Sequence, residues 1–237
     1  YRSRAADGSE VALKRLSRAH LHNADLAAVF ANEARVATEM QHPQLVGAID
    51  CGNVGGWPFL VMALAAGGSL DAQLGDGQGL GRERLCALAN DLGQALAAVH
   101  IQGYVHGDLS PGNVLFAGDG RALLSDFSAS TALGTRQPQP QGTFAYMSPE
   151  QVRGQAMDAR ADVFSLATLL WQCTSGQKVF WREAQHLCFM AVVEAEPPAM
   201  PEQFKAAESV LRTALSKEPA GRMESPSELC EAFIAAF

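Results

Sequence analysis

The middle of the sequence reads HGDLSPGNVLF across residues 106–116. Its first eight residues are typical of a tight loop, and the apolar run from Val114 to Phe116 predicts a short strand. Asp108 and Asn113 lie five positions apart in this loop, so their side chains can converge on one small volume. A carboxylate there could accept a proton and an amide oxygen could hold a cation, but most loop carboxylates are ordinary solvated turn residues.

A second carboxylate follows the next predicted strand. Residues 114–116 and 122–124 predict a strand pair, because Gly118-Asp119-Gly120 between them is a turn sequence. Ser125-Asp126-Phe127 comes directly after the second of these strands. Asp126 is therefore placed to ligate a hard, oxygen-seeking cation such as Mg²⁺.

A lysine lies inside an apolar strand near the start of the chain. Val11-Ala12-Leu13-Lys14 would bury part of the Lys14 ammonium group, which then needs an ionic partner or an anionic ligand. Glu33, on the inner face of the helix predicted over residues 23–40, could be that partner. By itself this pair is better explained as a solvated or structural one. Added to the two loops above, it completes a set suited to phosphoryl transfer: a cation for phosphates, metal ligands and a base.

The elements around these motifs predict two unequal parts. Residues 1–66 predict a small lobe with one main helix, a hairpin around Asp7-Gly8-Ser9, and strands over residues 45–50 and 58–63 joined by a turn at Gly55-Gly56. Residues 67–237 predict a larger, mainly helical lobe, with helices over residues 83–102, 162–173, 184–195, 204–216 and 227–237. The segment QPQPQ at residues 137–141 predicts a mobile part of a long loop rather than a binding motif. The expected fold class is therefore α+β.

Composition and charge restrict the classes of partner. The 237 residues are 48% hydrophobic and 18% charged, which is typical of a packed globular protein, and the net charge is −7. No basic stripe is visible, so we expect no nucleic acid partner. The five cysteines are scattered without a C-x-x-C pair, which favours reduced thiols and a cytoplasmic location. No apolar run reaches the roughly 18 residues of a membrane span, so we expect no membrane segment. The oligomeric state is not predicted.

The motifs occur in an informative order: VALK at 11–14, the helix residue Glu33, H-x-D-L-x-P-x-N at 106–113, DF at 126–127, and GTFAYMSPE at 142–150. In this order and through nearly the whole chain, the sequence resembles the protein kinase superfamily, most of all the bacterial serine/threonine kinases of the eukaryotic type. The resemblance implies a bilobal fold, ATP and Mg²⁺ as cofactors, and transfer of phosphate to Ser or Thr of protein substrates in signalling.

The resemblance also implies roles for the polar residues. Lys14 would hold the α- and β-phosphates of ATP and pair with Glu33. Asp108 would orient the acceptor hydroxyl and take its proton. Asn113 and Asp126 would hold Mg²⁺.

By the same resemblance, apolar residues would surround the adenine of ATP. Ala12 and Leu115 would lie on either side of the ring, with Met62 at the back of the pocket. Ala63 and Ala65 would offer backbone groups to the edge of the ring. These five residues complete the expected nucleotide site.

Further positions match segments that receive the substrate or hold the structure together. Thr143 and Tyr146 lie in the segment expected to receive the peptide. Glu150 and Arg222 would form a buried ion pair. Asp162, at the start of the expected central helix, would anchor the loop at residues 106–113, which the resemblance identifies as the catalytic loop.

The sequence departs from the family pattern in four places. No G-x-G-x-x-G precedes Lys14, and Tyr1 resembles a position within the second strand of the family. We therefore expect the first strand and the phosphate-covering loop to be absent from this piece. Nucleotide binding should be weaker as a result, because that loop donates backbone N–H groups to the phosphates. Gly107 replaces an arginine that commonly pairs with a phosphate on the activation loop, which implies either activation independent of loop phosphorylation or no need for activation. Ser110 replaces a lysine that helps neutralise the transferring phosphate. Ser128 replaces a glycine after Asp-Phe.

These departures leave alternatives to a protein kinase. One is a pseudokinase, a binding or scaffolding module that keeps the fold without turnover. Another is a small-molecule phosphotransferase, because residues 106–113 also resemble the aminoglycoside and choline phosphotransferases. Gly142-Thr143, Ser148-Pro149-Glu150 and Arg222 favour a peptide acceptor over a small molecule.

Overall fold

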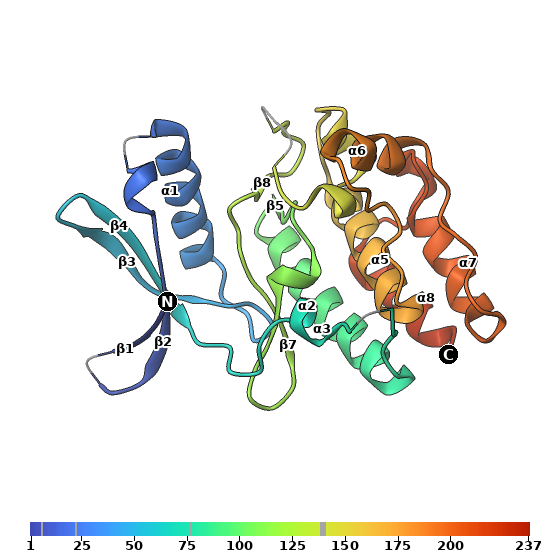
Figure 1. Cartoon of the computed structure of the whole chain (residues 1–237), viewed down its shortest axis with the longest axis horizontal. Helices are drawn as coiled ribbons and strands as arrows, with labels where there is room; N and C mark the ends of the chain where they lie inside the picture. Colours follow the sequence, from blue (N-terminus) through green and yellow to red (C-terminus); the bar gives the residue numbers. More distant parts are fainter. Residues whose placement is uncertain (6, 22, 76, 138–140) are drawn as a thin grey trace.

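The computed structural model describes residues 1–5, 7–21, 23–75, 77–137 and 141–237, so three residues of the QPQPQ segment lie outside the described part. Figure 1 shows an antiparallel sheet and helix α1 (Ala24–Glu39) at one end of the molecule and a group of helices at the other. This arrangement confirms the predicted α+β fold with a small sheet-bearing part and a larger helical part.

The sheet contains β1 (Arg2–Arg4), β2 (Glu10–Arg15), β3 (Ala48–Val54) and β4 (Trp57–Ala63), in the order β1-β2-β4-β3 with antiparallel neighbours. The β3–β4 turn needs two residues in the left-handed region, which Gly55 and Gly56 supply with φ of 59° and 86°. On β2, Lys14 lies directly opposite Leu60. Opposite residues project from the same face of a sheet, and Leu60 is fully buried in the core, so Lys14 also projects toward the interior.

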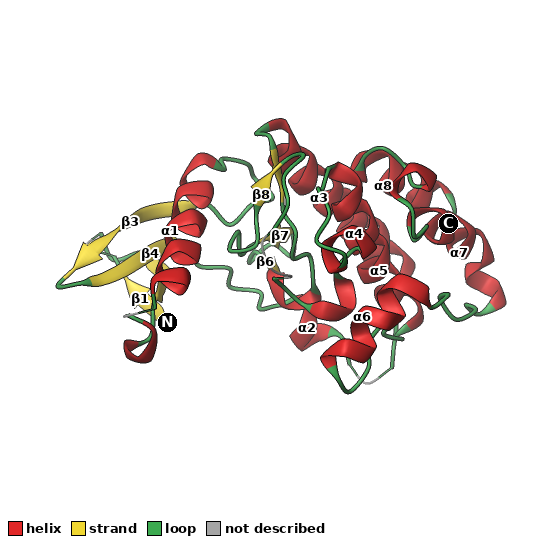
Figure 2. Cartoon of the chain, turned by 90° about the horizontal axis from the view of Figure 1, so that it is seen from above, coloured by secondary structure: helices red, strands yellow, loops and turns green. Residues whose placement is uncertain are grey.

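Helix α1 (Ala24–Glu39) packs alongside this sheet, as Figure 2 shows from above. It begins where the Asn23 side chain accepts the N–H groups of Asp25 at 3.0 Å and Leu26 at 3.1 Å, which satisfies two otherwise unpaired backbone donors. Its apolar stripe buries Phe30 and Val36. Glu33 lies on the same buried stripe, so its carboxylate requires a partner.

One strand prediction was partly wrong. Residues 45–50 predicted a strand, but β3 begins only at Ala48. Leu45 and Val46 leave the sheet and are buried beside β7 (Ala122–Leu124), where the Val46 N–H donates to Leu124 O at 2.9 Å and Leu45 forms a bridge with Leu124. Burial of these two side chains outweighs continuation of the strand, and it ties the sheet-bearing part to the region that carries Asp126.

Four short strands flank the loops of interest. β6 (Val114–Phe116) and β7 (Ala122–Leu124) pair as a hairpin with the predicted bounds, and β5 (Tyr104–Val105) pairs with β8 (Thr131–Ala132). The 3-10 helices are η1 (Arg18–His20), η2 (Pro111–Asn113), η3 (Phe144–Tyr146), η4 (Glu202–Phe204) and η5 (Pro219–Gly221). The loop that carries Asp108 joins β5 to β6, and the loop that carries Asp126 joins β7 to β8, so these two strand pairs hold the two loops side by side.

The larger part is helical. Its helices are α2 (Leu70–Gln73), α3 (Arg82–Ile101), α4 (Pro149–Val152), α5 (Ala159–Ser175), α6 (Gln185–Glu194), α7 (Lys205–Ala214) and α8 (Pro226–Ala235). The predicted long helices are all present, whereas the one-turn helices α2 and α4 were missed because four residues give no periodic signal. Within the described ranges, no helix combines the length and the apolarity that a bilayer crossing requires.

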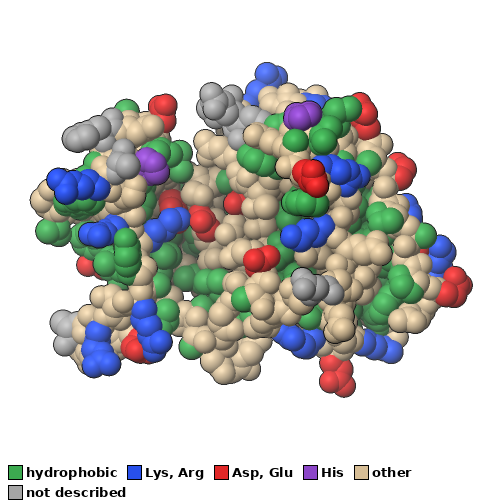
Figure 3. All heavy atoms as spheres, in the orientation of Figure 1, with side chains coloured by type: hydrophobic (Ala, Val, Ile, Leu, Met, Phe, Trp, Pro, Cys, Tyr) green, Lys and Arg blue, Asp and Glu red, His purple; other side chains and the backbone are tan. Residues whose placement is uncertain are grey.

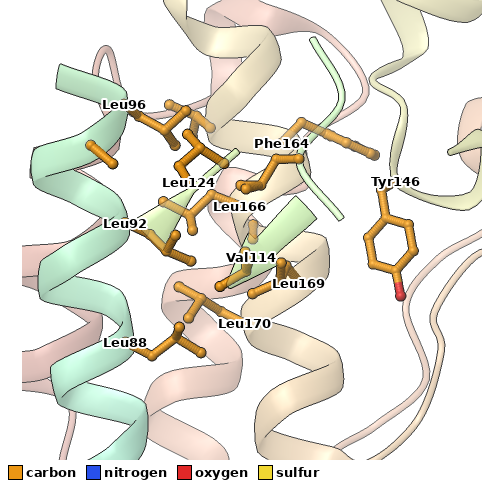
Figure 4. Close-up of a cluster of buried hydrophobic side chains, with 14 of the residues drawn as sticks. Leu88, Leu92, Leu96, Val114, Leu124, Tyr146, Phe164, Leu166, Leu169 and Leu170 are labelled. Atoms are coloured by element: carbon orange, nitrogen blue, oxygen red, sulfur yellow. The ribbon is translucent and has the colours of Figure 1, made fainter. Parts of the chain in front are cut away.

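Helix α5 is the centre of this part. Every residue from Ala161 to Thr174 is buried. The helix begins with Asp158 as its N-cap and ends at Gly176, whose φ of 74° suits a left-handed C-cap. Figure 4 shows leucines of α3 meeting leucines of α5, with Val114 and Leu124 of the β6–β7 hairpin between them. The loops that carry the candidate site therefore rest on a rigid core.

Candidate active site

A cavity of about 400 Å³ lies where the sheet-bearing part meets the helical part. Figure 3 shows acidic side chains gathered along the furrow between the two parts. The cavity wall includes every residue predicted to hold nucleotide or metal, together with the predicted partner of the lysine: Ala12, Lys14, Glu33, Met62, Ala63, Ala65, Asn113, Leu115 and Asp126. Val46 also lines it and was not predicted, because a valine at the edge of a strand carries no signal of its own.

Lys14 is the cationic centre of this cavity. Its Nζ lies 2.6 Å from Glu33 Oε1 and 3.2 Å from Asp126 Oδ2. Burial would lower the pKa of Lys14, but the carboxylates of Asp126 and Glu33 raise it above its ordinary value. The ammonium group is thus charged at neutral pH and is held in place by two elements far apart in the sequence.

Asp108 lies on the loop between β5 and η2, with both carboxylate oxygens engaged. Asn113 Nδ2 donates to Asp108 Oδ2 at 2.9 Å and to its backbone oxygen at 2.8 Å. The Thr143 N–H donates to Oδ1 at 2.7 Å. Burial raises the pKa of Asp108 above its ordinary value, although these hydrogen bonds favour the charged form. A carboxylate oriented in this way can accept a proton from a neighbouring hydroxyl.

Asp162 of α5 holds the loop that carries Asp108 in place. Its buried carboxylate accepts the N–H groups of His106 at 2.8 Å and Gly107 at 3.0 Å, and Oδ2 lies 2.7 Å from His100 Nε2. Burial alone would raise the pKa of Asp162, but these contacts with the histidines and the backbone hold it below its ordinary value. The predicted anchoring contact is therefore present in the structure.

Asn113 and Asp126 offer oxygen ligands from the two ends of the β6–β7 hairpin, because Asn113 directly precedes β6 and Asp126 follows shortly after β7. The Asn113 amide nitrogen is used by Asp108, which leaves its side-chain oxygen to face another partner. Asp126 has φ of 66°, the single positive value among the described non-glycine residues, and its Oδ1 accepts the Ser128 N–H at 3.1 Å. Among the described residues no group of three His, Cys, Asp or Glu side chains could hold a metal. An amide and a carboxylate fit Mg²⁺, which takes few protein ligands and completes its shell with water and phosphate oxygens.

A second cavity, of about 510 Å³, lies beside the catalytic loop. Thr143 and Tyr146, both predicted to contact substrate, line it together with Asp71, Ser110 and Trp181. The Thr143 side chain is exposed, whereas Tyr146 is buried and its hydroxyl bonds to the side chain of Gln172 on α5. Burial also raises the pKa of the Tyr146 hydroxyl. Tyr146 therefore forms a fixed wall and Thr143 an open edge of this cavity.

Gln151 is a contact that sequence reasoning missed. Its Nε2 donates to the Gly107 backbone oxygen at 2.8 Å, while its Oε1 accepts the Ser148 N–H at 3.0 Å. A signal was available, because Ser148 and Gln151 are the first and fourth residues of an S-x-x-Q capping box at the start of α4. The start of α4 is thereby attached to the loop that carries Asp108.

Glu150 and Arg222 form the predicted buried pair. Arg222 Nη1 and Nη2 donate to the two carboxylate oxygens of Glu150 at 2.7 and 2.9 Å. The Arg222 side chain is 0% exposed and the Glu150 side chain is 3% exposed. Such a two-pronged contact fixes the position of α4 relative to the end of the chain.

Comparisons with known proteins agree with this geometry. The profile described as "Protein kinase domain" matches residues 1–234. The chain is 31% identical to the probable serine/threonine-protein kinase SCO3848 of Streptomyces coelicolor, over 94% of this chain and 35% of that protein. It is 32% identical to the serine/threonine-protein kinase PknJ of Mycobacterium tuberculosis, over 95% of this chain and 40% of that protein. It is 30% identical to the serine/threonine-protein kinase PknD of the same species, over 92% of this chain and 34% of that protein. The chain spans 34–40% of the length of these relatives. With a matching profile over nearly its whole length, this chain belongs to the protein kinase domain family.

Proposed function

We propose that the protein transfers the γ-phosphate of Mg²⁺–ATP to serine or threonine hydroxyls of other proteins. The observation that carries the proposal is that Lys14 Nζ lies within 3.2 Å of a carboxylate oxygen of both Glu33 and Asp126, in a cavity whose wall also includes Asn113. These groups match the parts that phosphoryl transfer requires. The names of the relatives, all serine/threonine kinases, point the same way.

In this proposal each residue has one task. Lys14 holds the α- and β-phosphates, and Glu33 keeps its ammonium group in place. Asn113 and Asp126 hold Mg²⁺, which when bound neutralises developing charge on the phosphates. The backbone of Ala63 and Ala65 contacts the adenine edge, and apolar side chains enclose the ring.

Asp108 acts on the acceptor hydroxyl. As the hydroxyl oxygen forms a bond to the γ-phosphorus, its proton passes to the Asp108 carboxylate, and the bond from the γ-phosphorus to the bridging oxygen of ADP breaks. The hydrogen bonds from Asn113 and the Thr143 N–H orient the carboxylate but leave lone pairs for the hydroxyl. The acceptor segment would lie in the second cavity, against Thr143 and Tyr146.

The neutral Ser110 places a limit on this site. It lies in the wall of the second cavity, where the family pattern has a lysine, and it supplies no charge for the transferring phosphate. Loss of one such stabilising donor costs about 10²–10³-fold in rate. This observation keeps the pseudokinase as the alternative function.

The deciding measurement is transfer of label from γ-labelled ATP to a generic protein acceptor. We expect label on serine or threonine in the presence of Mg²⁺ and none after removal of the metal with EDTA, because Lys14 alone cannot neutralise the phosphates. Bound ATP without any transfer would replace the proposal by the pseudokinase. Label found only on added small hydroxyl compounds would replace it by a small-molecule phosphotransferase.

Lys14→Met is expected to weaken Mg²⁺–ATP binding by about 10- to 100-fold, the effect of losing a charged hydrogen bond. Isothermal titration of the variant against the wild type measures it. The matched control is Lys178→Met, because the exposed Lys178 lies over the Trp181 ring outside this cavity. Equal affinities of Lys14→Met and the wild type would contradict the assignment of the cavity to the phosphates.

A cytoplasmic location is part of the proposal. All five cysteines are free in the structure, including the exposed Cys51, and free thiols persist in a reducing compartment. The same compartment supplies ATP.

A further inference from the structure

Gly107 is enclosed by the segment that follows Asp126. Its φ is 76°, and a Cβ at this position would lie 2.9 Å from the backbone oxygen of Ala129. Its own N–H and oxygen are taken by Asp162 and Gln151. Any side chain on residue 107 would therefore push Ala129 and its neighbours away from the catalytic loop.

Gln137 occupies the space beside this glycine. Its Nε2 donates to the Ala129 oxygen at 2.5 Å and lies 3.5 Å from where a Gly107 Cβ would be. The Ala129 side chain is buried, and Gln137 is half-buried. The Gln137 amide thus joins the two ends of the loop from residue 129 to residue 137. This junction lies directly against Gly107, the residue that precedes Asp108.

The other hydrogen bonds between this segment and residues 106–108 also come from uncharged donors. Gln151 Nε2 donates to Gly107 O, the Ser130 hydroxyl donates to His106 O at 3.2 Å, and the Thr143 N–H donates to Asp108. Within the described residues, no lysine or arginine of the segment 129–151 forms a hydrogen bond or ion pair with residues 106–108. The segment and the catalytic loop are held together without any cation that a phosphate could engage.

We propose that Gln137 is a positioning residue that holds this segment against Gly107, so that Asp108 is oriented without phosphorylation of the segment. The inference rests on the proposed kinase function for its kinetic readout. Its structural readout does not, because the hydrogen bond of Gln137 exists before any substrate binds.

The first test is Gln137→Ala, with Gln141→Ala as the matched control in the same loop. We expect kcat to fall about tenfold, the effect of one hydrogen bond, while KM for ATP stays unchanged because the lysine cavity is not touched. We also expect amide hydrogen exchange in residues 142–147 to rise severalfold, since the Thr143 N–H loses its fixed acceptor. The exchange measurement decides the proposal even for a chain that transfers no phosphate.

A second variant separates positioning from general loop stability. In Gln137→Glu an ionised carboxylate faces the Ala129 oxygen and repels it, whereas the protonated acid can donate to it as the amide does. The ratio of kcat for Gln137→Glu to kcat for the wild type should therefore rise toward one as the pH falls toward the ordinary glutamate pKa of about 4.3. A loop that acts only through packing would give a ratio independent of pH.

Gly107→Arg supplies the opposite test. Because residue 107 has positive φ and faces Ala129, we expect this return to the family pattern to lower kcat rather than raise it. A raised kcat, or unchanged exchange and kcat in Gln137→Ala, would overturn the proposal. So would loss of activity when the wild-type protein is treated with a phosphatase, because the contact described here needs no phosphate.

Discussion

Asp108→Asn is expected to lower kcat for phosphate transfer by about 10³-fold, within the range that general-base catalysis supplies. The amide cannot accept the hydroxyl proton, and its NH₂ group would face the Thr143 N–H or the Asn113 NH₂ as a second donor. Affinity for ATP should be unchanged, because Asp108 is not part of the wall of the nucleotide cavity. Steady-state transfer of label and a separate binding titration measure the two effects.

The matched control is Asp119→Asn in the exposed β6–β7 turn, which removes a carboxylate of the same hairpin region without touching the loop. It should leave kcat at the wild-type value. Wild-type activity should also decline in acid, and it should begin to do so above the usual aspartate range, because burial raises the pKa of Asp108. Full activity in Asp108→Asn would remove Asp108 from the mechanism.

Arg222→Met is expected to lower the free energy of unfolding by about 3–5 kcal/mol, the usual cost of removing one partner from a buried ion pair. Arg222 donates to both Glu150 oxygens and to the backbone oxygens of Arg160, Ser216 and Lys217. The variant leaves a buried carboxylate and three carbonyl groups without their donor. Such a loss is a large fraction of the ~5–15 kcal/mol that stabilises a typical domain.

Chemical denaturation of both proteins gives this difference. Arg153→Met is the control, because Arg153 pairs with Glu218 at 3.2 Å on the surface, where such pairs contribute about 0–1 kcal/mol. If Arg222→Met shifted the unfolding free energy no more than Arg153→Met, Arg222 would not stabilise the fold in the way its contacts indicate. Double substitution of Glu150 and Arg222 should recover part of the loss, since no unpaired charge then remains.

Local patterns were sufficient for most of the fold. The β6–β7 hairpin follows from a glycine-rich turn between two apolar triplets, and α1 follows from its apolar spacing behind an asparagine cap. The strand expected at residues 45–50 was displaced because Leu45 and Val46 are buried beside β7. Periodicity cannot register such a competition, because the competing partner lies almost eighty residues away.

The candidate site divides in the same way. Its residue types and their order indicated which side chains can hold phosphate and metal or accept a proton. Their meeting is a tertiary event: Lys14 and Asp126 are 112 positions apart, and Thr143 reaches Asp108 across 35. The cavity contains both residues because the β2 register turns Lys14 inward and Asp126, whose backbone is left-handed, follows shortly after the β6–β7 hairpin.

The sequence by itself therefore determined the fold class, the long helices, the hairpins and the chemical character of the site, because turns, caps and apolar periods act over a few residues. The tertiary structure alone decided how Gln137, Ala129 and Gly107 meet and how Gln151 reaches the catalytic loop. These contacts join neutral groups through backbone atoms. Every residue has the same backbone donors and acceptors, so their partners are selected by packing and leave no pattern in the sequence.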